Sequence, residues 1–147
     1  MTIKFSTGLR NALAGTVGFK GAFTNGHINI YSGPQPLTGD TGATGTLLGT
    51  VSVDGTGGGL HFENPADGTV AKSITENWKF TGLANGTAGW FRMYPAAGDP
   101  SAFSTTEARM DGSIASSGGD ATLAGGVTIT LNAPSTMDAF FLTIPAQ

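Results

Sequence analysis

The stretch GTAGWFRMYP, residues 86–95, decides how this chain folds, because it gathers four large apolar side chains around a single arginine. In an extended strand, successive side chains point to opposite faces. Phe91 and Met93 would then face one side, while Trp90, Arg92 and Tyr94 would face the other. One side can pack into a core, but the opposite side needs a second layer or a partner to cover it.

The composition indicates one folded domain. The chain has 147 residues, of which 39% are hydrophobic, enough for a single ordinary core. Charged residues make up 12%, about half the typical ~25%. A net charge of −3 and 9% aromatic residues argue against disorder. We expect residues 1–23 to form an N-terminal arm or short helix and residues 24–147 to form the β domain.

Several classes of partner are disfavoured by the sequence. The seven basic residues are spread along the chain without a cluster, so we expect no nucleic-acid partner. The chain has no cysteine, which excludes disulfides and thiolate metal sites. No apolar run reaches signal-peptide length at the N-terminus or the ~18 residues of a membrane helix. We therefore expect a soluble protein without a leader and without a membrane partner.

The pattern of elements predicts an all-β fold after a short helix. Ser6 or Thr7 can cap a helix that carries Leu9 and Leu13 on one face and should end near Gly15. Farther on, short apolar runs separated by turn residues predict eight or nine strands. These runs are residues 27–31, 46–53, 60–62, 69–74, 78–80, 86–94, 108–114, 126–131 and 138–145. Because no helical pattern lies between them, they indicate an antiparallel β-sandwich or jelly roll.

Two local features follow from the turn residues. Asn85-Gly86 separates Trp78 and Phe80 from the aromatic run at 90–94, which predicts a β-hairpin. Asp111-Gly112 is also a turn pair, and we expect it to interrupt the strand that contains Met110 and Ile114.

No catalytic pattern emerges. His27 and His61 lie in predicted strands without a partner constellation, and no serine-nucleophile elbow is present. Turn chemistry accounts for five aspartates that each stand beside a glycine: Asp40, Asp54, Asp67, Asp111 and Asp120. A glycan-cleaving enzyme would need a carboxylate pair, yet no spacing selects one from Glu63, Glu76 and Glu107. We therefore expect no enzymatic activity, no catalytic residue, no cofactor and no metal.

Five sequence motifs resemble those of a known family. In order, they are GLRNALAG (8–15), HINIYSGPQP (27–36), GTLLGTVSVDG (45–55), GTAGWFRMYP (86–95) and ARMDGSI (108–114). They resemble small virion structural proteins of tailed bacteriophages, the head decoration or cementing proteins. None is a catalytic signature, and VGFKGAFTNG (17–26) departs from the more regular helix of the family.

The resemblance implies a non-enzymatic β module on the outer surface of the capsid. The implied partners are the major capsid protein and further copies of this chain, as a homodimer or homotrimer. The implied location is the virion, after synthesis in the host cytoplasm. The alternative is a carbohydrate- or receptor-binding module of a tail tip or fibre, in which exposed Trp78, Trp90 or Tyr94 would stack on sugar rings.

Two sets of residues are candidates for contact with a partner, because aromatic residues and arginine are enriched at interfaces. The first is Trp90, Arg92 and Tyr94, unless a second layer of the fold covers them. The second lies in the N-terminal segment, which is either an arm that orders on a neighbouring subunit or a helix that caps one end of the barrel. Its apolar residues include Ile3, Phe5, Leu9, Leu13, Val17 and Phe19.

Overall fold

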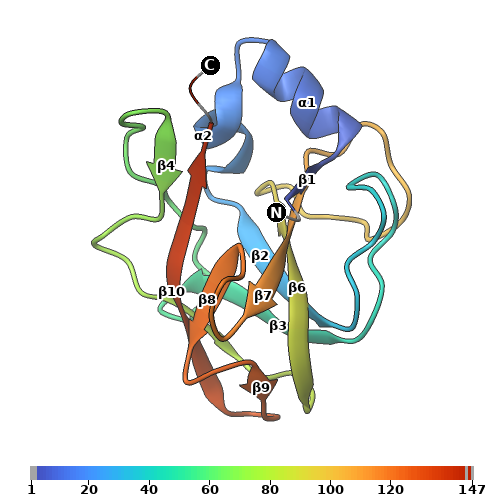
Figure 1. Cartoon of the computed structure of the whole chain (residues 1–147), viewed down its shortest axis with the longest axis vertical. Coiled ribbons are helices and arrows are strands. Elements are labelled where there is room, and N and C mark those ends of the chain that lie inside the picture. Colours follow the sequence, from blue (N-terminus) through green and yellow to red (C-terminus); the bar gives the residue numbers. More distant parts are fainter. Residues whose placement is uncertain (1–2, 145, 147) are drawn as a thin grey trace.

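The computed structural model describes residues 3–144 and 146, which are mostly β (Figure 1). Two short helices precede most of the strands: α1 (Thr7–Ala14) and α2 (Gly18–Phe23). The strands are β1 (Lys4–Phe5), β2 (His27–Ser32), β3 (Leu47–Val53), β4 (Thr69–Ala71), β5 (Trp78–Thr81), β6 (Gly86–Tyr94), β7 (Met110–Ala115), β8 (Ala121–Ala124), β9 (Thr128–Ile129) and β10 (Pro134–Thr143).

Seven strands close into a barrel. Their order around the wall is β7-β8-β10-β5-β3-β2-β6, and β6 pairs with β7 to complete the circuit. The short strands β1, β4 and β9 are added by pairing with β7, β10 and β6. The all-β prediction is confirmed. The expected sandwich or jelly roll is not, because these pairings describe one closed wall.

One pair of barrel strands, β7 and β8, is parallel although only residues 116–120 connect them. Parallel neighbours usually need a connection of a dozen or more residues. Here Asp120 stabilises a tight return by accepting hydrogen bonds from the backbone N of Ser113 at 2.8 Å and from its Oγ at 2.9 Å. A Cβ on Gly119 would lie 2.6 Å from the Ala115 nitrogen, so the return requires glycine. Strand β8 was not predicted from the sequence.

The core fills the barrel as the alternation of residues 86–95 predicts. Phe91 and Met93 are buried in it, together with Ile28 and Ile30 of the neighbouring β2. Aromatic rings pack at one level of the interior, where the Phe62 and Trp78 ring centroids lie 5.5 Å apart in an edge-to-face contact. Apolar burial of this kind is the main stabilising term of the fold.

The N-terminal segment closes one end of the barrel. Ser6 caps α1 by accepting a hydrogen bond from the Leu9 N–H, and the helix ends at Gly15, as predicted. The second helix, α2, was not predicted. It places Phe19 and Phe23 in the core, where their rings meet edge to face at 5.0 Å.

The predicted hairpin across Asn85-Gly86 is wrong. Strand β5 lies between β3 and β10, whereas β6 lies between β2 and β7, so the two strands belong to different parts of the wall. The Asn85 side chain does not shape a turn; its Oδ1 accepts a hydrogen bond from the Leu131 N–H at 2.9 Å. The local sequence favoured a turn, but burial of both strands among non-adjacent neighbours decides the pairing.

Other strand boundaries also differ from the prediction. Asp111-Gly112 does not interrupt β7, because Asp111 has a buried ion-pair partner and Gly112 leaves room for the Phe91 ring. Residues 60–62 form only isolated bridges, and the expected strand at 126–131 is reduced to Thr128–Ile129.

Gly49 provides a test of the packing inside the wall. A Cβ at this position would lie 2.1 Å from Cδ2 of Phe80, so Gly49→Ala must displace a fully buried ring. We expect a loss of about 1–3 kcal/mol in the free energy of unfolding, measured by urea denaturation. Gly58→Ala is the matched control, because its Cβ would make only ordinary contacts. Equal stability of the two variants would contradict this packing.

Candidate functional site

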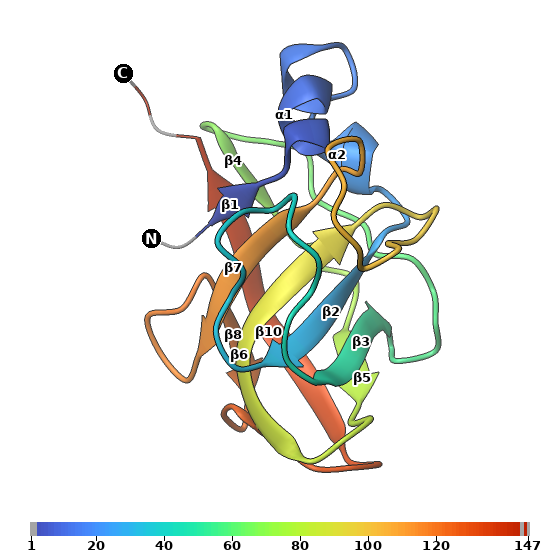
Figure 2. The same ribbon diagram turned by 90° about the vertical axis from the view of Figure 1, so that its right-hand side faces the viewer.

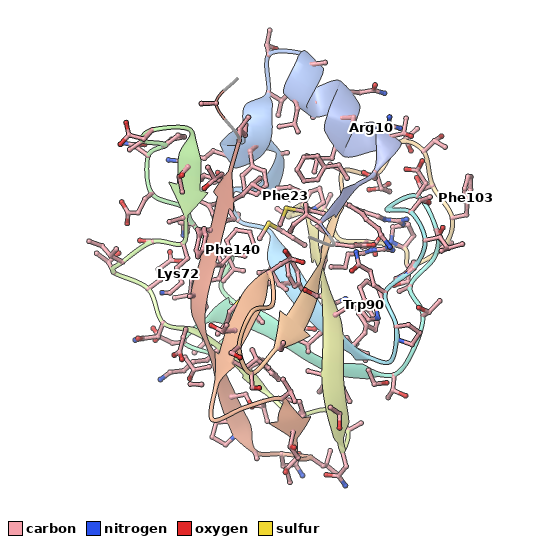
Figure 3. All side chains as sticks on the ribbon, viewed as in Figure 1. Arg10, Phe23, Lys72, Trp90, Phe103 and Phe140 are labelled. Atoms are coloured by element: carbon pink, nitrogen blue, oxygen red, sulfur yellow. The ribbon has the colours of Figure 1, made fainter. Side chains whose placement is uncertain are left out.

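The outer face of β6 is covered by two long loops. The loop at residues 33–46 passes in front of β2 and β6 in Figure 2, and the loop at 95–109 lies nearby. Beneath them, Trp90 stacks on Tyr31 of β2 with ring centroids 4.6 Å apart, and the Arg92 guanidinium lies 5.5 Å from the Trp90 ring. Figure 3 shows Trp90 outside the barrel, whereas Phe23 and Phe140 lie within it.

Four charged side chains form a buried cluster next to Trp90, which we call the charged quartet: Arg92, Asp99, Arg109 and Asp111. Arg92 of β6 donates two hydrogen bonds of 2.7 Å to the carboxylate of Asp111 on β7. Arg109 donates to Asp99 through Nε at 2.7 Å and lies 2.6 Å from it through Nη2. Their side chains are at most 1% exposed. Buried charges require such partners, because unpaired they would lose their hydration without compensation.

Two further donors of the quartet bind the covering loops. Arg92 Nη2 donates to the carbonyl of Thr41 at 2.9 Å, and Arg109 Nη2 donates to the carbonyl of Ala102 at 2.8 Å. Although burial acts to lower it, the pKa of Arg92 is raised, because Asp111 and Asp99 favour the charged form. The quartet therefore joins two strands and two loops into one rigid unit.

Helix α1 is attached to this unit at its N-terminus. The Ser6 hydroxyl accepts from the Arg109 N–H at 2.8 Å and donates to the Glu107 carbonyl at 2.7 Å. Asp40, in the loop before β3, accepts 2.7 Å hydrogen bonds from both the N–H and the hydroxyl of Thr7. Partial burial acts to raise the pKa of Asp40, but these hydrogen bonds and nearby arginines lower it below its usual value.

The structure corrects the first set of expected contact residues. Trp90 and Arg92 are fully buried within the chain, and Tyr94 is half-buried, so they form no open contact face. The loops provide the second layer that the alternation required. Beneath that layer, Arg92 is fully buried and paired with Asp111.

The aspartates divide into two groups. Asp54 and Asp67 adopt positive φ angles of 53° and 50°, which supports their interpretation as turn residues. Asp40 and Asp111 bind Thr7 and Arg92 instead, so turn chemistry was the wrong explanation for them. Asp99 was not singled out at all, since nothing in its local sequence distinguishes it from a loop residue.

The second set of expected contact residues lies on the capped end of the barrel. Leu9 and Phe19 are buried in the core, while Ile3, Phe5 and Leu13 are partly buried against it. The segment is therefore a cap of the barrel and not a free arm.

An apolar groove opens beside this cap, and we call it the cap groove. It has a volume of about 430 Å³ and lies between the helices, β4 and the end of β10; its lining includes Phe5, Leu13, Val17, Phe19, Val70 and Leu142. In its lining, Val17 and Ile144 are 53% and 64% exposed, and Phe141, the neighbour of Leu142 in β10, is 63% exposed. Single exposed apolar residues are ordinary, but several beside an apolar groove are typical of a binding surface.

A second hollow, shallower and more polar, lies outside β2, β3 and β5. His27 stacks on Tyr94 there with ring centroids 6.0 Å apart, and its Nε2 lies 3.1 Å from the Gly57 carbonyl. Burial, with nearby Tyr31 and Asp99, raises the pKa of Tyr94 to about 12. Both tryptophans are fully buried, so neither can offer a stacking platform to a sugar.

The glutamates proposed as a possible acid pair have separate structural roles. Glu76 accepts hydrogen bonds from Nε1 of Trp78 at 2.9 Å and from the N–H of His61 at 3.1 Å. Glu63 accepts a hydrogen bond from the backbone N–H of Ile74, and Glu107 lies within the loop at 95–109, where its carbonyl accepts from the Ser6 hydroxyl. Within the described residues, no three or more His, Cys, Asp or Glu side chains are grouped so as to hold a metal ion.

Comparisons with family models, curated proteins and solved structures gave no match. In the described part of the chain, no helix has the length and apolar character needed to span a membrane.

The contribution of the charged quartet to stability can be tested by removing one partner of an ion pair and, in a second variant, both partners. Asp111→Ala leaves a buried arginine without its main partner, so we expect a loss of about 3–5 kcal/mol in unfolding free energy. The double variant Arg92→Met with Asp111→Leu removes both charges and should lose clearly less. Urea denaturation followed by tryptophan fluorescence measures both. Equal losses would mean that the ion pair is not what stabilises this layer.

The cap of α1 predicts a dependence on pH. Because the pKa of Asp40 is lower in the folded state, its contribution is complete above the unfolded value near 4 and is lost as the pH falls through the folded value. Asp40→Asn should lose about 1 kcal/mol at pH 7 and show a shallower decline below pH 4. Asp138→Asn, at an exposed site, is the control. Parallel curves for wild type and Asp40→Asn would refute the assignment.

Proposed function

We propose that this chain is a head decoration protein of a tailed bacteriophage, which stabilises the capsid by protein–protein contact without catalysing a reaction. The proposal rests on the five sequence motifs and on one structural observation, the cap groove with exposed Val17 and Ile144 in its lining. Its partners are the major capsid protein and, as a homodimer or homotrimer, further copies of the chain.

The cap groove fits such a contact better than the face that carries Trp90, Arg92 and Tyr94. Buried apolar anchors surrounded by polar groups carry most of the binding energy at interfaces. Val17 and Ile144 come from opposite ends of the sequence and line the same groove, so a partner seated there would contact both the helical cap and the barrel wall. Burying roughly 100 Å² of apolar surface contributes about 2–3 kcal/mol before the costs of association.

The arrangement of charge supports the same function. Four of the 17 charged residues form the buried quartet, where they hold loops rather than face solvent. A binding surface that is ordered before contact loses less affinity to ordering, and a wall whose loops are bonded to its strands provides such order. The alternative of a carbohydrate-binding tail module would depend on Tyr94 and His27 in the shallow polar hollow.

Fractionation of the particle tests the proposal directly. Heads and tails of the phage that encodes this chain are separated, and each fraction is analysed by mass spectrometry. We expect the chain in stoichiometric amounts on heads and absent from tails. Its presence only on tails would favour the carbohydrate-binding alternative, and its absence from both fractions would refute a virion function.

The cap groove is tested by rebinding purified protein to heads that lack it. Val17→Asp places a charge in the groove and should weaken attachment at least about tenfold, because an unpaired charge is costly at an apolar contact. Leu37→Asp is the matched control, since Leu37 is 89% exposed in a loop that does not line the groove. Equal attachment of both variants would exclude the groove as the contact.

A further inference from the structure

Among the described residues, β8 closes the barrel over only part of the wall, and we call the unpaired part between β1 and upper β10 the seam. In the lower half of the barrel wall, β8 lies between β7 and β10 and pairs with both. In its upper half, β1 takes the position next to β7, through Lys4↔Asp111 and Phe5↔Met110. No strand pairing among the described residues joins β1 to β10, although Figures 1 and 2 show β1 above β8, across from the upper part of β10.

The direction of the backbone groups follows from the bonds on the other side of each strand. The Phe140 carbonyl accepts from Lys72, and the Ile144 N–H donates to Gly68, so even-numbered residues of upper β10 face β4. Because backbone direction alternates along a strand, the N–H and C=O groups of Phe141 and Thr143 face the seam. By the same reasoning, the Ser6 N–H donates to the Arg109 carbonyl, so Phe5 directs its backbone groups toward the seam.

The seam is hollow and partly apolar. A cavity of about 150 Å³ is lined by Ile3 on the β1 side, by residues 141–143 on the β10 side and by Gly119 and Asp120 at its lower end. Leu142 lines both this cavity and the cap groove, so the two hollows share a wall. Two strand edges and an apolar surface therefore come together at one place.

We propose that the seam binds an extended peptide segment of a partner chain, which adds as a β-strand to the edge formed by Phe141 and Thr143. The inference builds on the proposed function, and it names the kind of contact that the capsid protein would make: an extended arm with apolar side chains at alternate positions. Those side chains would pack on Leu142 and Ile3, while the main chain pairs with the open edge.

An extended peptide matches the seam better than other occupants do. Strand edges offer backbone donors and acceptors at intervals of two residues, which only another extended main chain can satisfy throughout. A helix or a lipid tail has no free backbone groups to offer. The folded body of a second copy has most of its strands already paired in its own barrel, so a flexible arm reaches the edge more readily.

The first experiment uses a synthetic peptide with valine at alternate positions, threonine between them and a lysine at each end. Its addition to the full-length ¹⁵N-labelled protein should shift amide resonances at residues 3–5, 119–120 and 141–144. The same peptide with N-methyl groups on the amides that would face β10 should bind at least about fivefold more weakly. Equal binding of the methylated peptide, or shifts around His27 and Tyr94, would overturn the proposal.

A variant of the edge provides the second test. Thr143→Pro removes an N–H that faces the seam and leaves the β4 side of the strand intact, a position where a strand tolerates proline. Thr143→Ala is the matched control, because both variants lose the 2.8 Å hydroxyl contact with Thr69 and only the first loses the N–H. We expect about fivefold weaker peptide binding for Thr143→Pro and unchanged binding for Thr143→Ala.

Rebinding to heads separates this inference from the function on which it builds. If Thr143→Pro attaches as well as Thr143→Ala, the seam is not the capsid contact and the proposal fails while decoration stands. If the peptide binds at the seam but the chain is absent from particles, the strand-addition site stands and the capsid function fails. Concentration-dependent dimers that shift the same resonances without peptide would instead identify a second copy as the occupant and overturn the proposal.

Discussion

The pairing of two buried arginines with two buried aspartates on the outside of the barrel determines much of the rest of the structure. A β-barrel normally leaves its outer face to solvent, yet here Trp90 and Arg92 are fully buried on that face. Arg92 can be buried there because Asp111 pairs with it from the neighbouring strand and because the Thr41 carbonyl, in the loop at 33–46, accepts a further hydrogen bond. The loops, in turn, have little apolar content of their own, so the arginines supply the contacts that order them. The buried ion pairs therefore need the loops as cover, and the loops need the ion pairs to be ordered.

The consequences extend to the capped end of the barrel. Arg109 contributes its side chain to the quartet and its backbone N–H to Ser6, the residue that caps α1. Asp40 lies in a loop that the quartet orders and binds the first turn of the same helix. The cap groove is bounded by that helix, so its shape depends on ion pairs that lie outside the barrel wall. A surface that binds partners must be held in one form before binding if its affinity is not to be reduced by ordering, and this chain of contacts provides such order.

The sequence predicted the fold class and the direction of the key side chains more accurately than it predicted which residues those side chains contact. Alternation along residues 86–95 placed Phe91 and Met93 inside and Trp90 and Arg92 outside, since that pattern depends only on the geometry of a strand. The predicted hairpin failed because strand order is decided by contacts between distant residues, and Asn85-Gly86 looks like a turn whichever strands it connects. Asp99 could not be recognised, because a loop aspartate becomes a buried ion-pair partner only when the fold brings two arginines to it. In the candidate site, the N-terminal residues were found by their apolar character, whereas Phe141 and Val70 required knowledge of how β4 and β10 pair.

The unpaired strand edge at the seam has different consequences in solution and in an assembly. Closed barrels avoid aggregation because they leave no strand edge free, and in the described part of this barrel no pairing joins β1 to β10 where β1 replaces β8. An open edge beside exposed Phe141 and Ile144 would be a liability for a protein that remains alone in solution. It is an advantage for a protein that becomes part of a permanent assembly, because main-chain pairing and apolar burial then act together at one contact. The seam and the cap groove share Leu142, so the unpaired strand edge adjoins an apolar surface, an arrangement suited to binding an extended chain.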